Sequence, residues 1–178
     1  MAIFTLTYPK ATERLSTYPI VNSDNELVCI LQQVQRSTIG KIVNAAALVA
    51  IQQSLPYRYE TRTPQGKLLF QVRSTLLTKG VSHQIIMPDG SCIPIQRKTV
   101  QLLESSYSFT MDGLVFRFEQ DFTSTAYLYC NDEKIASAHF VNNGIVRDGI
   151  VYQLFQSDDP LFVALLASLF QTLFALRS

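Results

Sequence analysis

The stretch from Pro160 to Leu176 constrains the fold more than any other part of this sequence. It is apolar almost all round, and its polar side chains, Ser168, Gln171 and Thr172, fall on one narrow face of a helix. Asp159 is suited to cap such a helix, and proline suits its first turn. A helix that is apolar on nearly every side must be buried in protein or in lipid.

Two environments can bury this helix. Residues 160–176 would span about 25 Å, which is short for a bilayer core of about 30 Å. A membrane anchor would also leave just Arg177 and Ser178 on the far side. The strands predicted for the preceding sequence, by contrast, need something to fill the space between them. We therefore favour a helix inside a ring of strands and keep a C-terminal anchor over 161–176 as the alternative.

The sequence before this helix is divided by turn signals at short intervals. Between turns such as Pro64-Gln65-Gly66, apolar residues alternate with polar ones, as at Leu68, Phe70 and Val72. This period of two is typical of strands with one buried face. Asp112-Gly113 predicts a tight hairpin, because its turn needs positive φ at both residues. We expect a mainly β (α+β) fold, a closed antiparallel barrel threaded by the C-terminal helix.

One further segment departs from the strand pattern. Apolar residues recur at helical spacing between Thr38 and Leu55, with Ser37 or Thr38 as a cap and Pro56 as a stop. We expect an additional helix near 38–55 on the domain surface. No linker or low-complexity tract interrupts the sequence, so residues 1–178 are predicted to form a single domain.

Composition limits the functions that this chain can serve. Its formal net charge is +1, whereas a general nucleic-acid binder usually carries a strong basic excess. Cys29, Cys92 and Cys130 are odd in number, widely spaced and set in apolar strand-like surroundings, which indicates buried free thiols in a reducing compartment. We expect a cytoplasmic protein that does not bind nucleic acid.

Motifs for common chemistries are absent from the sequence. Gly40-Lys41 lacks the other residues of a phosphate-binding loop, and neither GxGxxG nor GxSxG occurs. His83 and His139 have no partner at a zinc-like spacing and are interpreted as ordinary strand residues. Cys92 follows a turn and is expected to be partly exposed. We predict no catalytic residue, no metal and no cofactor.

The order of strands, turns and closing helix resembles a known superfamily. The resemblance rests on four parts of the sequence: Tyr57–Thr61 with Pro64–Lys67, Ser108–Gly113, Lys134–Ala138 and the apolar helix. From about Tyr57 to Leu176 the chain resembles the tubby C-terminal-like superfamily, which includes tubby proteins, phospholipid scramblases and LURP-one-related proteins. The resemblance implies a β-barrel threaded by an apolar C-terminal helix, with the segment 38–55 as an insertion. It also implies a binding module rather than an enzyme.

Basic residues are the candidate ligand-binding groups. Tubby proteins bind phosphoinositides through a basic face of the barrel, so a comparable face here would contact anionic headgroups or phosphates. The candidates lie in or near two predicted hairpins: Arg58, Arg62, Lys67, Arg73, Lys79, Arg97 and Lys98. The alternative is a solvated outer face that Glu60 and Glu104 balance.

Three functional hypotheses follow. The first is a non-catalytic module that binds anionic phospholipid or a protein partner, cytoplasmic and peripheral at the membrane rather than integral to it. The second is a membrane-tethered protein anchored by residues 161–176. The third is an enzyme with an unrecognised site.

Overall fold

The computed structural model describes residues 1–8, 17–34, 58–77, 80–101, 104–143 and 146–174. The additional helix predicted near 38–55 lies outside these residues, and so do Lys79 and the final turn of the helix predicted to Leu176. Whether residues 1–178 form a single domain stays a prediction.

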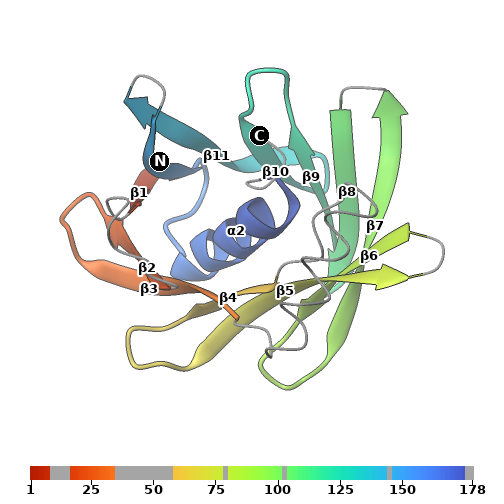
Figure 1. Cartoon of the computed structure of the whole chain (residues 1–178), viewed down its shortest axis with the longest axis horizontal. Helices are drawn as coiled ribbons and strands as arrows, with labels where there is room; N and C mark the ends of the chain where they lie inside the picture. The colour runs from red at the N-terminus through yellow and green to blue at the C-terminus, as the bar shows by residue number, and fades with distance from the viewer. Residues whose placement is uncertain (9–16, 35–57, 78–79, 102–103, 144–145, 175–178) are drawn as a thin grey trace.

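The strands form a closed antiparallel barrel, as predicted, with the C-terminal helix inside it (Figure 1). In chain order the described elements are β1 (Ala2–Thr7), β2 (Thr17–Asn22), β3 (Leu27–Gln33), β4 (Arg58–Arg62), β5 (Leu68–Leu77), β6 (Gly80–Ile86), β7 (Cys92–Gln101), β8 (Glu104–Met111), β9 (Leu114–Gln120), β10 (Ala126–Cys130), β11 (Glu133–Asn143), β12 (Val146–Leu154) and α2 (Pro160–Leu173).

Each strand pairs with its neighbours in sequence, and β1 closes the barrel against β12. The closing register places Ala2 opposite Leu154 and Leu6 opposite Ile150. Gly149 permits this close approach, since a Cβ at that position would lie 2.2 Å from the backbone oxygen of Leu6. The predicted hairpin at Asp112-Gly113 is confirmed: both residues have positive φ, 52° and 78°, and they join β8 to β9.

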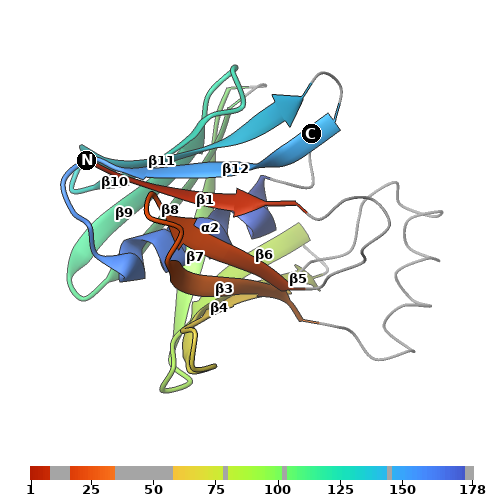
Figure 2. The same cartoon turned by 90° about the vertical axis from the view of Figure 1, so that its left-hand side faces the viewer.

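Because neighbouring strands run in opposite directions, the connections alternate between the two ends of the barrel. One end carries the turns at 23–26, 63–67, 87–91, 112–113 and 131–132, together with the N-terminus of α2. We call it the helix-entry end. Figure 2 shows α2 starting near the N-terminus of the chain and running through the barrel toward the opposite end.

Helix α2 fills the barrel. Asp159 caps it, accepting a hydrogen bond from the backbone N of Leu161 at 2.9 Å, and Pro160 occupies its first turn, as the sequence predicts. From Val163 to Phe174 every side chain is buried. Phe170 packs against Phe140 with the rings tilted by 52° and their centroids 5.0 Å apart. The prediction of an internal helix is therefore confirmed.

The polar residues of α2 bind the barrel wall. The hydroxyl groups of Ser168 and Thr61, on β4, lie 3.1 Å apart, and the Thr61 hydroxyl also donates to the backbone oxygen of Ala164 at 3.2 Å. The Gln171 amide donates to the Tyr8 hydroxyl at 2.9 Å. These bonds satisfy buried polar groups and set the rotation of the helix about its axis.

Within the residues that the structure describes, no helix combines the length and apolarity needed to cross a bilayer.

Candidate functional site

Two arginines occupy opposed strand positions on the outer wall formed by β4, β5 and β6. On this wall Tyr59 and Val72 point inward and are buried, so the residues before and after them point outward. Arg58 on β4 lies directly opposite Arg73 on β5 in the strand register. Side chains at directly opposed positions are about 5 Å apart at Cβ, so two like charges face each other here.

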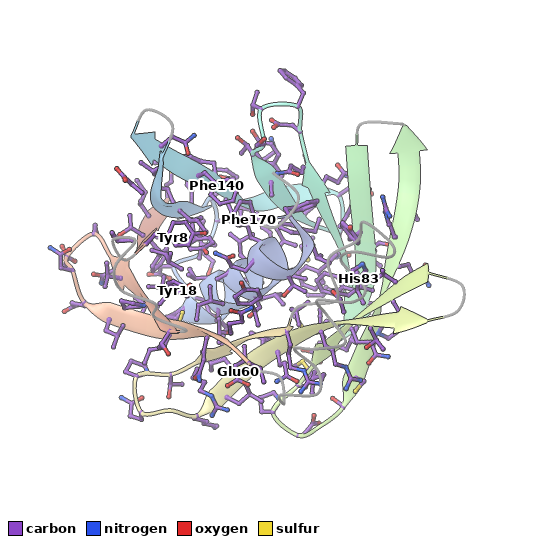
Figure 3. The ribbon with its side chains drawn as sticks, in the orientation of Figure 1. Tyr8, Tyr18, Glu60, His83, Phe140 and Phe170 are labelled. Carbon is purple, nitrogen blue, oxygen red and sulfur yellow. The ribbon has the colours of Figure 1, made fainter. Side chains whose placement is uncertain are left out.

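The carboxylate on this part of the wall already has partners. One oxygen of Glu60 accepts from Arg62 Nε at 2.7 Å, and the other accepts from the Gln71 amide at 3.1 Å. Arg62 also donates to the backbone oxygen of Gly66 at 2.8 Å. Figure 3 shows Glu60 on this wall, outside the packed interior that contains Phe140 and Phe170. Glu60 therefore balances Arg62 and not the arginine pair.

Arg58 and Arg73 form no ion pair with any described residue. Arg73 donates from Nη2 to the Gln84 side chain at 2.8 Å, while its buried Nε has no hydrogen-bond partner among the described atoms. Both side chains are half-buried. Two guanidinium groups in this arrangement can bind the oxygens of one phosphate, which would relieve their mutual repulsion. We call Arg58 and Arg73 the arginine pair.

The other basic candidates lie farther from this pair or face elsewhere. Lys67 is exposed in the turn between β4 and β5, at the helix-entry end. Lys98 is exposed on the outer face of β7, opposite Ser106. Arg97 lies on the opposite face of the same strand, paired with the inward-facing Tyr107. Of the six candidates that the structure describes, the register directly pairs just Arg58 with Arg73.

A buried contact between a hydroxyl and an imidazole was not anticipated from sequence. Ser74 Oγ on β5 lies 2.7 Å from His83 Nδ1 on β6, and the imidazole ring meets Tyr107 edge-on. The two residues are nine apart in sequence, but the β5–β6 register places them side by side. This distance fits a nucleophile and its base, yet both side chains are buried against solvent. A substrate has no access to them, so the contact is structural.

The thiols agree in part with their sequence interpretation, since Cys29 is buried but Cys130 is half-buried and Cys92 is exposed, and the second histidine is a strand residue as predicted. All three cysteines are free, and Cys92 is exposed. Burial raises the pKa of the Cys29 thiol from its ordinary 9.0 to about 12, which makes it unreactive near neutral pH. His139 points outward from β11, opposite Val151. Across the described ranges, no three His, Cys, Asp or Glu side chains are grouped so that they could hold a metal ion.

Comparison with known proteins identifies the family. The model of the Tubby C-terminal like domain matches residues 4–176, which is nearly the whole chain. The chain belongs to this family, in agreement with the barrel and its internal helix. No curated protein and no solved structure matches it. Membership of this family indicates a binding module of a generally non-catalytic kind.

Proposed function

We propose that this chain is a non-catalytic module that binds the phosphate groups of anionic phospholipids through Arg58 and Arg73. The observation that carries the proposal is that two half-buried arginines occupy directly opposed positions on β4 and β5, with the neighbouring carboxylate already bound to Arg62 and Gln71. Like charges at opposed strand positions destabilise a sheet, so their presence here calls for a counter-charge.

The chemistry of arginine suits a phosphate ligand. Guanidinium groups donate two parallel hydrogen bonds to phosphate oxygens, and these bonds are stronger than neutral ones. Gln84 already holds Arg73 by its Nη2 atom, which limits the conformations of that side chain. A ligand therefore meets one arginine that Gln84 holds and a second that pairs with no described carboxylate. The family supports this reading, since tubby-like domains bind phosphoinositides or proteins in general.

Vesicle flotation tests the proposal. Vesicles of phosphatidylcholine with and without a few per cent of phosphatidylinositol phosphate are floated with wild-type protein, Arg58→Gln, Arg73→Gln and Lys134→Gln at low salt. Lys134 is the matched control, because it is an exposed cation on β11 that lies over the Tyr127 ring. A lost charge-assisted hydrogen bond costs about 1.5–3 kcal/mol, so each arginine variant should bind about tenfold more weakly or worse.

The control should stay within twofold of the wild type. An equal loss in Lys134→Gln would show general electrostatic attraction, and an absence of flotation by the wild type would overturn the proposal. Titration with a soluble inositol phosphate separates recognition of the headgroup from recognition of the bilayer surface.

A further inference from the structure

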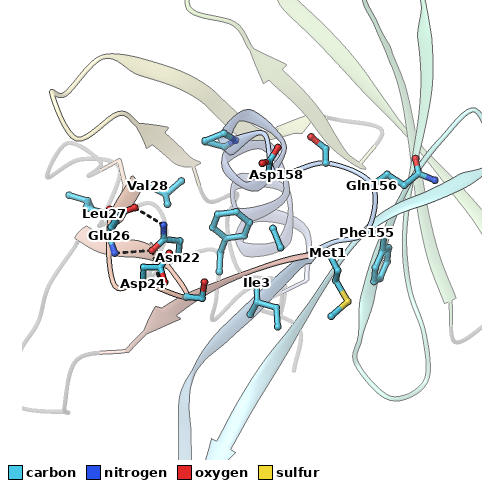
Figure 4. Close-up of a pocket in the computed structure, with 15 residues that line it drawn as sticks. Met1, Ile3, Asn22, Asp24, Glu26, Leu27, Val28, Phe155, Gln156 and Asp158 are labelled. Atoms are coloured by element: carbon cyan, nitrogen blue, oxygen red, sulfur yellow. Dashed lines mark hydrogen bonds between the residues drawn. The ribbon is translucent and has the colours of Figure 1, made fainter.

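A groove opens at the helix-entry end, beside the first residues of α2. Its volume is about 950 Å³, and it is lined by β1, the turn between β2 and β3, and the connection from β12 to α2 (Figure 4). It lies at the opposite end of β4 from Arg58, since that strand runs from Arg58 toward the helix-entry end. The groove is therefore separate from the arginine pair.

Apolar side chains are unusually exposed in this groove. Met1 is 80% exposed, Ile3 43% and Leu27 42%, and all three line the groove. Phe155 lines it as well, from the start of the connection to α2. Exposed apolar side chains beside charged ones are typical of an interaction site.

The polar rim of the groove is mainly acidic, and the α-amino group of Met1 is the cation among its described lining residues. Asp24, Glu26 and Asp158 line it, and no lysine or arginine occurs among its described lining residues. Asn22 holds the turn between β2 and β3 in place, because its side-chain oxygen accepts from the backbone N of Asp24 and of Glu26 at 3.0 and 2.9 Å. The carboxylates of this turn are thus presented from a fixed backbone.

This combination selects one class of occupant. Anionic lipid headgroups and nucleic acid would be repelled by the three carboxylates. A metal ion needs clustered ligands, and no three acidic side chains in the described part are close enough to hold one. A purely apolar occupant would leave the carboxylates facing it without compensation. A peptide that carries Lys or Arg beside a bulky apolar residue satisfies both halves of the groove.

We propose that the groove docks a cationic, apolar-bearing segment of a protein partner. The apolar residue of that segment would lie on Ile3, Leu27 and Met1, with its basic side chains toward Asp24, Glu26 and Asp158. The proposal does not depend on lipid binding by the arginine pair.

Selection from a random dodecapeptide library tests the proposal without assuming a sequence. The immobilised wild-type protein is the target. Counter-selection on the immobilised Asp24→Asn/Glu26→Gln/Asp158→Asn variant removes peptides that bind elsewhere on the protein. Enriched peptides should carry a net positive charge and at least one large apolar side chain. Their affinity for the triple variant should fall about tenfold at low salt, because exposed charge pairs each contribute about 0.2–1 kcal/mol.

Two control variants make the result specific to the groove. Asp148→Asn removes an exposed carboxylate from β12, and Val115→Ser removes an apolar side chain of comparable exposure from β9. Both should bind the selected peptides within twofold of the wild type, whereas Leu27→Ser should weaken binding severalfold. Failure to enrich any peptide over the triple variant would overturn the proposal, as would enrichment of neutral or acidic peptides.

Sedimentation of the protein alone tests a second copy as the occupant. We expect a monomer. If the wild type is a dimer, and if both the triple variant and Arg58→Gln are monomers, the arginine pair of another copy fills the groove. That result would overturn the proposal of a separate partner.

Discussion

Replacing Arg58 by glutamine should make the unliganded protein more stable while it weakens phosphate binding. Arg58 and Arg73 are directly opposed on β4 and β5, and no described carboxylate neutralises either of them. Removing one charge therefore removes a repulsion and breaks no ion pair within the described residues. Most substitutions at a site that contributes nothing but structure would destabilise the protein instead.

The magnitude follows from the geometry of opposed strand positions. Two unit charges about 6 Å apart repel by roughly 0.7 kcal/mol in a fully aqueous environment, and by more where the side chains are half-buried. Measured cross-strand charge effects are about 0.2–1 kcal/mol. We expect the free energy of unfolding of Arg58→Gln to exceed that of the wild type by about 0.5–1 kcal/mol in 20 mM salt. Screening should reduce this gain to near zero in 0.5 M salt.

Urea unfolding followed by tyrosine fluorescence provides the assay, because the chain has eight tyrosines and no tryptophan. Arg58→Lys serves as the control, since it keeps the charge and should match the wild type at both salt concentrations. A phosphate ligand at a hundred times its Kd should stabilise the wild type by about 2.7 kcal/mol and the glutamine variant by much less. A gain in stability that persists in high salt, or a loss in low salt, would refute the electrostatic reasoning.

Three other outcomes are expected. Phe170→Ala should lower the free energy of unfolding by about 3–5 kcal/mol in urea titrations, because this fully buried ring packs against Phe140 and its removal leaves a cavity in the core. Phe122→Ser should change it by less than about 0.5 kcal/mol, since Phe122 is 93% exposed; a larger loss would show that the ring packs against the protein in solution. Cys92 should react with a maleimide at pH 8 while Cys29 does not, as mass mapping can show. Because the folded-state pKa of Cys29 is raised to about 12, its contribution to stability should be lost as the pH rises from about 9 to 12.

The architecture was largely predictable from sequence because its signals are local. The apolar run with an Asp-Pro start identifies α2, and the alternation around Phe70 and Val72 identifies an inward and an outward strand face. The Asp112-Gly113 pair identifies a hairpin through the φ angles it favours. Burying α2 then requires a ring of strands, so local patterns determine the global arrangement.

The candidate site was much less predictable, because it depends on register. Sequence places Arg58 and Arg73 in one hairpin, but their direct opposition follows from the bulge between Thr61 and Arg62, which shifts the pairing of β4 and β5 by one residue. Arg97 and Lys98 are adjacent in sequence, yet they lie on opposite faces of β7. The Ser74–His83 contact and the acidic groove likewise form between segments that no local motif connects.

Hydrogen exchange of α2 tests the central claim that the barrel encloses this helix. If the strands surround it, the amides of residues 163–173 can exchange only when the barrel itself opens. Mass spectrometry should then find peptides from α2 exchanging no faster than peptides from β12, with both approaching the rate set by global unfolding. Exchange in α2 that is orders of magnitude faster than in β12 would mean that the helix detaches from an intact barrel, and would contradict this account.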